Sequence, residues 1–242
     1  MHIHSVLSPC ADLSMGPKNI ISAAKAKGVN IIGVTDHNSA KNLAAFEKLA
    51  KLERSITLLY GIEVETKEEI HVLCYFETLD KVSAFDNIIY DSIKDVKNNP
   101  DIFGDQVIID SDENIIGYEE KLLLQRCELT IQQLADKVNK FDGMIIPAHI
   151  DRPSNGILTN LGFVPENIYF DAFEISPNTK TEDVLKTHPY LKNKNLIRSS
   201  DAHLLTEVGK AVINFQMPHP TFENIKFAFL NRLGRRWWVS SE

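Results

Sequence analysis

Histidines in this sequence gather in short clusters at the ends of apolar runs, several of them beside an acidic residue. Six of the eight histidines lie in such clusters: His2-Ile3-His4, Asp36-His37, His71, His149 and Asp201-Ala202-His203. On a strand, alternation of side chains would place His2 and His4 on one face and Ile3 on the other. Neutral imidazoles and carboxylates bind Zn²⁺, Mn²⁺ and Fe²⁺, and such a site with open positions activates water. The sequence therefore predicts a metal site, and hydrolysis is the leading functional hypothesis.

The candidate ligands follow the strands of an alternating α/β pattern. Helical spacing of apolar residues predicts helices over residues 17–27 and 40–53. Apolar runs predict strands over residues 29–35, 56–64, 70–76, 144–148, 168–175 and 195–200. Several short parallel strands indicate a barrel, in which the carboxyl ends of the strands meet on one face. We therefore expect ligands that are distant in sequence to meet on that face.

The regular pattern is interrupted between residues 77 and 128. This segment predicts a helix over residues 82–98, followed by a hairpin of strands over residues 106–110 and 115–124. It is longer than an ordinary connection between barrel elements, so we expect it to decorate one rim and to shape substrate entry. The capping box at Thr130 and Gln133 marks the return of the regular pattern. We expect a single domain over residues 1–242 that carries this insertion.

Composition restricts the partners and the cellular compartment that we expect for the protein. The chain has 242 residues, 43% hydrophobic content and a formal net charge of −7, which makes a long nucleic acid an unlikely partner. Its three cysteines show neither C-x-x-C spacing nor an even disulfide framework, which favours a reducing cytoplasm. No apolar stretch is long enough to cross a bilayer, so we expect no membrane partner. Met1 stands directly before the first ligand, and we expect the native chain to extend upstream.

Taken together, the motifs resemble those of the PHP (polymerase and histidinol phosphatase) family. The resemblance rests on His2-Ile3-His4-Ser5, Thr35-Asp36-His37, Gly61-Ile62-Glu63, His71, His149 and Ser200-Asp201-Ala202-His203. It covers most of the chain outside the insertion, and the order and spacing of the motifs make it specific. It implies a distorted seven-stranded β/α barrel, similar to a TIM barrel, with a trinuclear metal centre that hydrolyses phosphate esters.

The resemblance also implies a ligand set for two or three divalent ions, Zn, Mn or Fe. The first ion would be held by His2, His4, Glu63 and Asp201, the second by Glu63, His71 and His149, and the third by His37 and His203. Glu63 would bridge the first two ions, in preference to Glu65 on the same strand face. The family completes the third site shortly after its opening motif. Here Asp12 is the expected ligand, and Cys10 is the alternative for a zinc-selective site.

The expected reaction is hydrolysis of a small phosphorylated substrate by metal-activated water. Glu63 and Asp201 would position the metals and the water, and His203 is a candidate general acid for the leaving group. Arg152 could grip a phosphate with its guanidinium fork, or it could form a salt bridge to Asp151 or Asp171. Asn38 follows a ligand and is a second candidate for substrate binding.

Three alternatives to a small-substrate phosphatase stay open. A 5′ exonuclease on short oligonucleotides would differ mainly at the entrance, where the acidic residues Asp110, Asp112 and Glu113 disfavour a long polyanion. A metallo-amidohydrolase also begins with His-x-His, but that family bridges its metals with a carboxylated lysine where this chain offers Glu63. A non-catalytic metal-binding scaffold is known among PHP domains, but such scaffolds often lose ligands that are present here.

Overall fold

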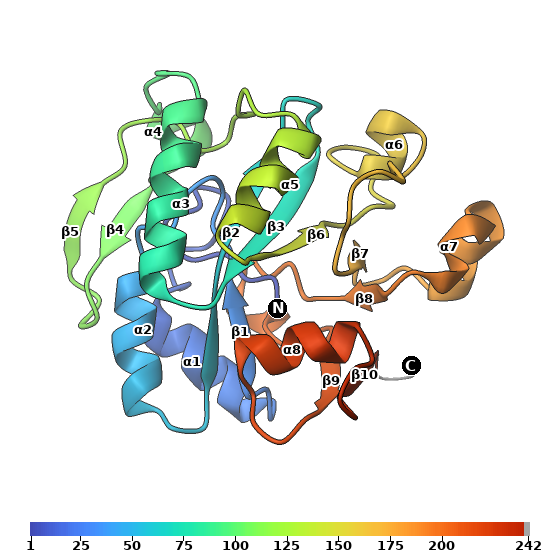
Figure 1. Cartoon of the computed structure of the whole chain (residues 1–242). Helices are drawn as coiled ribbons and strands as arrows, with labels where there is room; N and C mark the ends of the chain where they lie inside the picture. The colour runs from blue at the N-terminus through green and yellow to red at the C-terminus, as the bar shows by residue number, and fades with distance from the viewer. Residues whose placement is uncertain (240–242) are drawn as a thin grey trace.

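The computed structural model describes residues 1–239, which form a mixed α/β fold around one four-stranded sheet (Figure 1). The strand order is β1 (Ile31–Val34), β2 (Thr57–Glu65), β3 (His71–Phe76) and β6 (Met144–Pro147). β1 and β2 are parallel, whereas β3 runs antiparallel to both β2 and β6. The direction of β3 follows from its short connection to β2, which allows only a hairpin.

Three two-stranded pairs surround the central sheet. β7 (Phe173–Ile175) is parallel to β8 (Leu196–Arg198), β9 (Ile213–Gln216) is antiparallel to β10 (Arg236–Val239), and β4 (Val107–Ile109) is antiparallel to β5 (Ile115–Tyr118). The segment that carries His2 and His4 joins β1 to the residues after β8 only through isolated bridges, from Ile3 to Val34 and to Ala202.

The expected seven-stranded barrel is not confirmed, because the strands of residues 1–239 form separate sheets without a closed barrel. A barrel requires a continuous ladder around its circumference. Here the ladder narrows to single bridges at Ile3. Among the described residues β6 and β7 form no ladder, and they are joined by separate bonds that include Asp171 N to Ile145 O and Ile150 N to Glu174 O. The antiparallel β3 further departs from a regular β/α barrel.

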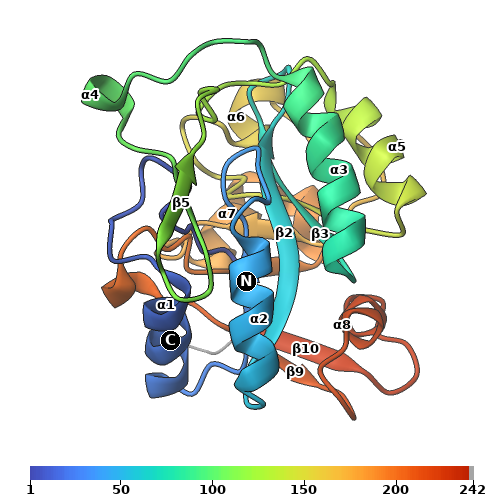
Figure 2. The ribbon, with the colours of Figure 1, turned by 90° about the vertical axis from the view of Figure 1, so that its left-hand side faces the viewer.

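The helices cover the faces and ends of these sheets. Their bounds are α1 (Pro17–Ala26), α2 (Leu43–Leu52), α3 (Leu79–Ser92), α4 (Pro100–Phe103), α5 (Ile131–Lys140), α6 (Ile157–Leu161), α7 (Thr181–Thr187) and α8 (Phe222–Phe229), with short 3₁₀ helices at Pro189–Asn193 and Leu205–Glu207. α3 and α5 lie side by side over the face of β2, β3 and β6, as both ribbon views show (Figures 1 and 2). Pro17 begins α1, and the predicted capping box of Thr130 and Gln133 begins α5.

No helix of the described part of the chain is long and apolar enough to cross a membrane.

The predicted insertion forms α3, α4 and the hairpin of β4 and β5, which stands at one side of the molecule (Figures 1 and 2). Its helix runs over Leu79–Ser92 and begins earlier than predicted, because the side chain of Thr78 caps it. The hairpin is tied to the body through Val107, whose N–H donates to Val6 O. The amide of Asn42 also donates to Val107 O and to Ser5 Oγ.

Candidate metal centre

The predicted ligands converge at one edge of the central sheet. His37 follows β1, Glu63 lies near the end of β2, and His149 follows β6. His71 begins β3, and it reaches the same edge because β3 runs in the opposite direction and pairs His71 with Glu65. Candidate ligands that are distant in sequence therefore lie close together, as expected from their positions at the ends of strands.

Glu63 lies at the middle of this cluster and is 1% exposed. Its Oε1 is 3.0 Å from His71 Nδ1 and 3.3 Å from both His149 Nε2 and His2 Nε2, and its Oε2 is 3.1 Å from His37 Nδ1 and 3.3 Å from His4 Nε2. Burial alone would raise the pKa of Glu63, but the surrounding imidazoles, led by His71, hold it well below its usual range. Glu63 is therefore an anion whose two oxygens face opposite sides of the cluster, as a bridging ligand requires.

A second acidic residue, Asp201, completes a group with His2 and His4. Its Oδ1 lies 3.3 Å from His2 Nε2 and 3.5 Å from His4 Nε2, and the two Nε2 atoms are 3.1 Å apart. Burial opposes protonation of His4, but hydrogen bonds with Asp201 and Glu63 outweigh it and raise the pKa of His4 to about 9. The pKa of His2 is also raised, since nearby carboxylates, led by Asp201, outweigh burial. This group therefore attracts positive charge.

The outward nitrogens of these two rings show that the residues fit a cation. His2 Nδ1 faces the carboxylate of Glu174 at 2.9 Å, and His4 Nδ1 faces the hydroxyl of Ser8 at 3.0 Å. With hydrogens on both Nδ1 atoms, both Nε2 lone pairs point into the cluster. Two lone pairs 3.1 Å apart repel each other, and a positive charge between them, either a proton or a metal ion, relieves this repulsion.

Two further groups can each hold an ion. The ligand atoms of His37, Glu63 and His71 lie within 4.8 Å of one another, as do those of His4, His37 and His203. Burial lowers the pKa values of His37 and His203, which keeps both rings neutral and suited to bind metal. His4 and His37 thus each belong to two of the three groups.

Two of the ligand positions have a backbone conformation that residues other than glycine rarely adopt. The φ angles are +28° at His149 and +46° at Asp201, and Asn38, next to His37, has +48°. Such backbone costs on the order of 1–3 kcal/mol at each residue and is typical of functional sites. This backbone conformation therefore reduces the stability of the fold while it directs the side chains of His149 and Asp201 toward the cluster.

The structure does not bring Asp12 into any of the three groups found among residues 1–239. Its exposed carboxylate accepts a hydrogen bond from Ser14 N at 2.8 Å, and hydrogen bonding with the side chain of Ser14, followed by this backbone bond, lowers the pKa of Asp12. The alternative, Cys10, is an exposed free cysteine. Partial burial of its sulfur and the nearby charge of Glu63 raise the pKa of the thiol to about 12, so it is protonated in the absence of a metal.

Asn38 is not placed to bind a substrate, contrary to the prediction. Its buried side-chain amide donates to Leu123 O at 2.8 Å and to Gln125 O at 2.7 Å, and its oxygen accepts from Glu65 N. These bonds tie the ligand loop to the insertion and leave no side-chain polar atom unengaged.

Arg152 forms a salt bridge, but its partner is neither of the two named from the sequence. Its side chain is 45% exposed, and its Nη2 lies 3.0 Å from Asp201 Oδ2. The salt bridge joins a candidate metal ligand, not Asp151 or Asp171, which accept hydrogen bonds from Ser176 N and Ile145 N.

Glu174 is a functional residue that the sequence reasoning missed. It lies on β7 and is 1% exposed, and its Oε1 accepts hydrogen bonds from His2 Nδ1 and from His149 N at 3.3 Å. Its Oε2 is buried and has no hydrogen-bond partner among the described residues. A carboxylate behind a ligand histidine fixes the ring and raises its basicity. The signal was a glutamate between Phe173 and Ile175 in an apolar strand.

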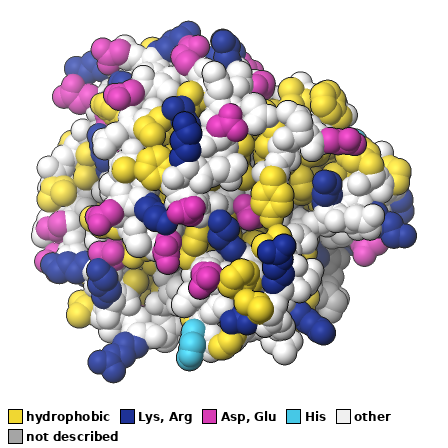
Figure 3. All heavy atoms as spheres, viewed as in Figure 1, with side chains coloured by type: hydrophobic (Ala, Val, Ile, Leu, Met, Phe, Trp, Pro, Cys, Tyr) yellow, Lys and Arg dark blue, Asp and Glu magenta, His cyan; other side chains and the backbone are white. Residues whose placement is uncertain are grey.

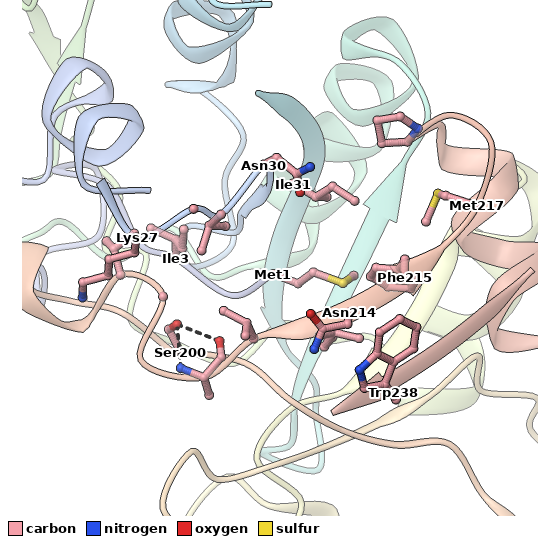
Figure 4. Close-up of a pocket in the computed structure, with 18 residues that line it drawn as sticks. Met1, Ile3, Lys27, Asn30, Ile31, Ser200, Asn214, Phe215, Met217 and Trp238 are labelled. Carbon is pink, nitrogen blue, oxygen red and sulfur yellow. Dashed lines mark hydrogen bonds between the residues drawn. The ribbon is translucent and has the colours of Figure 1, made fainter. Parts of the chain in front are cut away.

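A cavity of about 520 Å³ lies on the reverse side of the first segment (Figure 4). Its lining includes Ile3, Ile31, Phe215 and Trp238, and it contains none of the predicted metal ligands. Ile3 points into it because successive side chains alternate, while His2 and His4 point to the metal cluster. The cavity is thus separate from the candidate centre.

Comparisons with known proteins agree with the site. A family model described as PHP domain matches residues 1–171, and one described as PHP-associated matches residues 192–232. The uncharacterized protein YqxK of Bacillus subtilis is 28% identical over 218 residues, which cover 79% of this chain and 49% of YqxK. The chain therefore spans about half the length of that relative.

Solved structures resemble the whole chain. The lesion-specific endonuclease PfuEndoQ from Pyrococcus furiosus superposes with a TM-score of 0.73 at 22% identity, over 98% of this chain and 56% of the endonuclease. Endonuclease Q in complex with a 27-mer duplex that has an abasic lesion at the active site gives a TM-score of 0.69 at 22% identity, over 98% of this chain and 57% of that one. At these identities the likeness shows a shared fold.

Proposed function

The chain belongs to the PHP domain family, and from this we propose that it is a hydrolase that cleaves phosphoester bonds with divalent metal ions held around Glu63. The observation that carries the proposal is the buried Glu63 carboxylate, with imidazole nitrogens on both oxygens and Asp201 nearby. Ions bound there would lower the pKa of water and neutralise charge on a phosphate. A carboxylate bridge, in place of a carboxylated lysine, favours this reaction over amide hydrolysis.

The protein's own residues have separable roles in this proposal. Glu63 and Asp201 supply the negative charge that the cluster needs, and Glu174 orients His2 from behind. Arg152, at the exposed margin of the cluster, would turn from Asp201 to a substrate phosphate. Burial lowers the pKa of His203, so we assign it as a neutral ligand and not as the general acid.

The first candidate substrate is a small phosphorylated molecule. The net charge of −7 supports this choice, because a polyanion would be repelled by the molecule as a whole. On the face shown in Figure 3, basic and acidic side chains are interspersed, without a broad patch of one sign.

The second candidate is a phosphodiester in DNA. Its support is the likeness to endonuclease Q. The likeness covers nearly all of this chain, and endonuclease Q acts on a duplex with an abasic lesion. This likeness is at odds with the expectation that long nucleic acid is an unlikely partner. The two candidates differ in what must reach the cluster, so the substrate assay decides between them.

The experiment that tests the proposal is hydrolysis by protein reconstituted with Mn²⁺ or Zn²⁺. The substrates are sugar phosphates, histidinol phosphate, mononucleotides, nucleotide bisphosphates, 5′-phosphorylated oligonucleotides and a duplex with one abasic site. We expect metal-dependent cleavage that a chelator abolishes, and the preferred substrate separates the two candidates. If metal binds but every substrate stays intact, the amidohydrolase and scaffold alternatives replace this proposal.

Two variants connect the activity to the cluster. Asp201→Asn and His37→Ala should reduce hydrolysis by about 100-fold, because the first removes the negative charge of a predicted metal ligand and the second removes a predicted ligand altogether. Far-UV circular dichroism should show that both variants keep the fold. Unchanged turnover in either variant would contradict the assigned site.

A further inference from the structure

Ser8 and Asp36 form a hydrogen-bonded pair directly behind His4. The hydroxyl of Ser8 donates to Asp36 Oδ1 at 2.7 Å, and the same oxygen accepts from Ser5 N at 2.6 Å. Asp36 Oδ2 accepts from Ser5 Oγ at 2.6 Å. Ser8 is fully buried and Asp36 is 2% exposed, so water does not compete for these bonds.

The direction of the Ser8 hydroxyl bond follows from its partners. A hydroxyl has one hydrogen, and the shortest of its three contacts is with the carboxylate of Asp36. The other two contacts must then be accepted by Oγ, from His4 Nδ1 at 3.0 Å and from His37 N at 3.2 Å. His4 therefore carries its hydrogen on Nδ1 and presents the lone pair of Nε2 to the cluster.

We propose that Ser8, held by Asp36, is a positioning residue that sets the tautomer of His4 and aligns it with His37 for metal binding. The inference rests on the proposed metal-dependent function and adds residues that are not themselves ligands. His4 belongs to two of the three candidate groups, whereas the group of His37, Glu63 and His71 does not contain it. The tautomer of His4 should thus affect the ions at two of the groups, whereas Ser8 reaches the third group only through its contact with the backbone N–H of His37.

The sequence around Ser8 contains no motif that identifies its role. Asp36 directly precedes His37, which suggests that it orients that neighbour, but its carboxylate instead binds Ser5 and Ser8. The hydrogen bonds of Asp36 with Ser5 and Ser8 link the opening segment to the loop after β1. His2 is held differently, because Glu174 binds its Nδ1 directly.

Two variants and one matched control test the inference. Ser8→Ala removes the acceptor of His4 Nδ1, whereas Ser8→Thr retains a hydroxyl and serves as the rescue variant. The control is Ser199→Ala, because Ser199 is also fully buried but its hydroxyl has no hydrogen-bond partner among the described residues. Thermal unfolding of each metal-free variant shows whether it folds.

The direct readout is the tautomer of His4 in metal-free protein, measured by long-range ¹H–¹⁵N spectra of histidine-labelled samples above pH 9. In wild type and in Ser199→Ala we expect the hydrogen on Nδ1, and in Ser8→Ala a mixture of both tautomers. Because no metal is present, this readout does not depend on the proposed function. An unchanged His4 tautomer in folded Ser8→Ala would overturn the inference.

The second readout is Zn²⁺ content and affinity, measured by elemental analysis after dialysis and by calorimetry. We expect Ser8→Ala to lose affinity about 10–100-fold at the sites that use His4 while it retains at least one ion, and Ser8→Thr to recover most of the loss. Loss of every ion, or of none, in Ser8→Ala would contradict the selective role. If wild type itself binds no Zn²⁺ or Mn²⁺, the proposed function fails, and the tautomer measurement still decides the role of Ser8.

Discussion

At the scale of single residues, the centre depends on how Glu63 divides its two oxygens. Oε1 faces His71 and His149, and Oε2 faces His37 and His4. The imidazoles keep this buried carboxylate ionised because they lower its pKa against the effect of burial. A neutral side chain of the same shape would therefore lose the attraction while it kept the packing.

Glu63→Gln should lower both metal content and hydrolysis by at least about 100-fold, because an amide nitrogen would replace one of the two anionic oxygens. Elemental analysis and phosphate release measure the two effects. Glu65→Gln is the matched control, since Glu65 lies on the same strand and its Oε2 is 3.9 Å from His71 Nε2, whereas Glu63 Oε1 is 3.0 Å from His71 Nδ1. Equal losses in the two variants would show that Glu63 has no special role.

The raised pKa of His4 predicts how the metal-free protein responds to pH. Its folded-state pKa of about 9 exceeds the unfolded value of 6.5, so the stabilisation is fully present below pH 6.5 and is lost as pH rises through about 9. His2 acts in the same direction. We expect the unfolding temperature of chelated protein to fall between pH 6.5 and 9.5.

The metal-loaded protein should show the opposite trend in affinity. Binding must displace the proton that His2 and His4 share, so affinity should rise with pH over the same interval. Calorimetry in buffers of different ionisation enthalpy would count the released protons. Binding without proton release at pH 7 would contradict this account of the pair.

At the scale of elements, the insertion is joined to the ligand loops by side chains of the body. Asn38 bonds to Leu123 O and Gln125 O, and Asn42 bonds to Val107 O. The insertion therefore braces the loop that carries His37, in addition to forming one rim of the molecule.

Asn38→Ala should destabilise the fold by about 1–3 kcal/mol, because it leaves two buried carbonyl groups without their donor. Its φ of +48° adds strain for alanine, so Asn38→Gly, which lacks that strain, should be less destabilised. Urea unfolding measures both. Asn139→Ala on the exposed face of α5 is the control, and a loss of stability equal to that of Asn38→Ala would contradict the bracing role.

The sequence predicted the elements better than their arrangement. The predicted strands next to His37, Glu63, His71, His149 and Asp201 are present, because apolar runs bounded by polar residues report burial, whereas the opening segment with His2 and His4 forms only isolated bridges. The barrel was not confirmed, because periodicity carries no information on strand direction. The spacing of β2 and β3 does determine that these two strands are antiparallel, since residues 66–70 are too few for the crossover that parallel strands need.

The part of the candidate site that can be predicted from sequence is the part whose chemistry follows from residue type. Histidines and acidic residues at strand ends indicated candidate ligands, and the structure places most of them close together, while their role as ligands stays a prediction. Glu174 and Ser8 could not be identified in this way, because their roles depend on which ring nitrogen they face. Asp12 was chosen by its type alone, and the local turn directs its carboxylate to Ser14.

At the scale of the whole molecule, metal binding should contribute to stability, because the ligands come from segments that only the folded chain brings together. Zn²⁺ at 100 times its dissociation constant would stabilise the fold by about 2.7 kcal/mol for one site. Scanning calorimetry with and without chelator measures this gain. Asp201→Asn should show a smaller gain, and an equal one would place the stabilising ion elsewhere.

The single bridges of Ile3 to Val34 and Ala202 show that the centre joins the first residues of this chain to a segment near its end. On the ribosome, His37, Glu63 and His71 are made close together, so their group can assemble early in synthesis. Asp201 follows more than a hundred residues later, on the order of ten seconds at ordinary translation rates. The candidate groups therefore become complete at different times during synthesis, with the group of His37, Glu63 and His71 first and the group that needs Asp201 last.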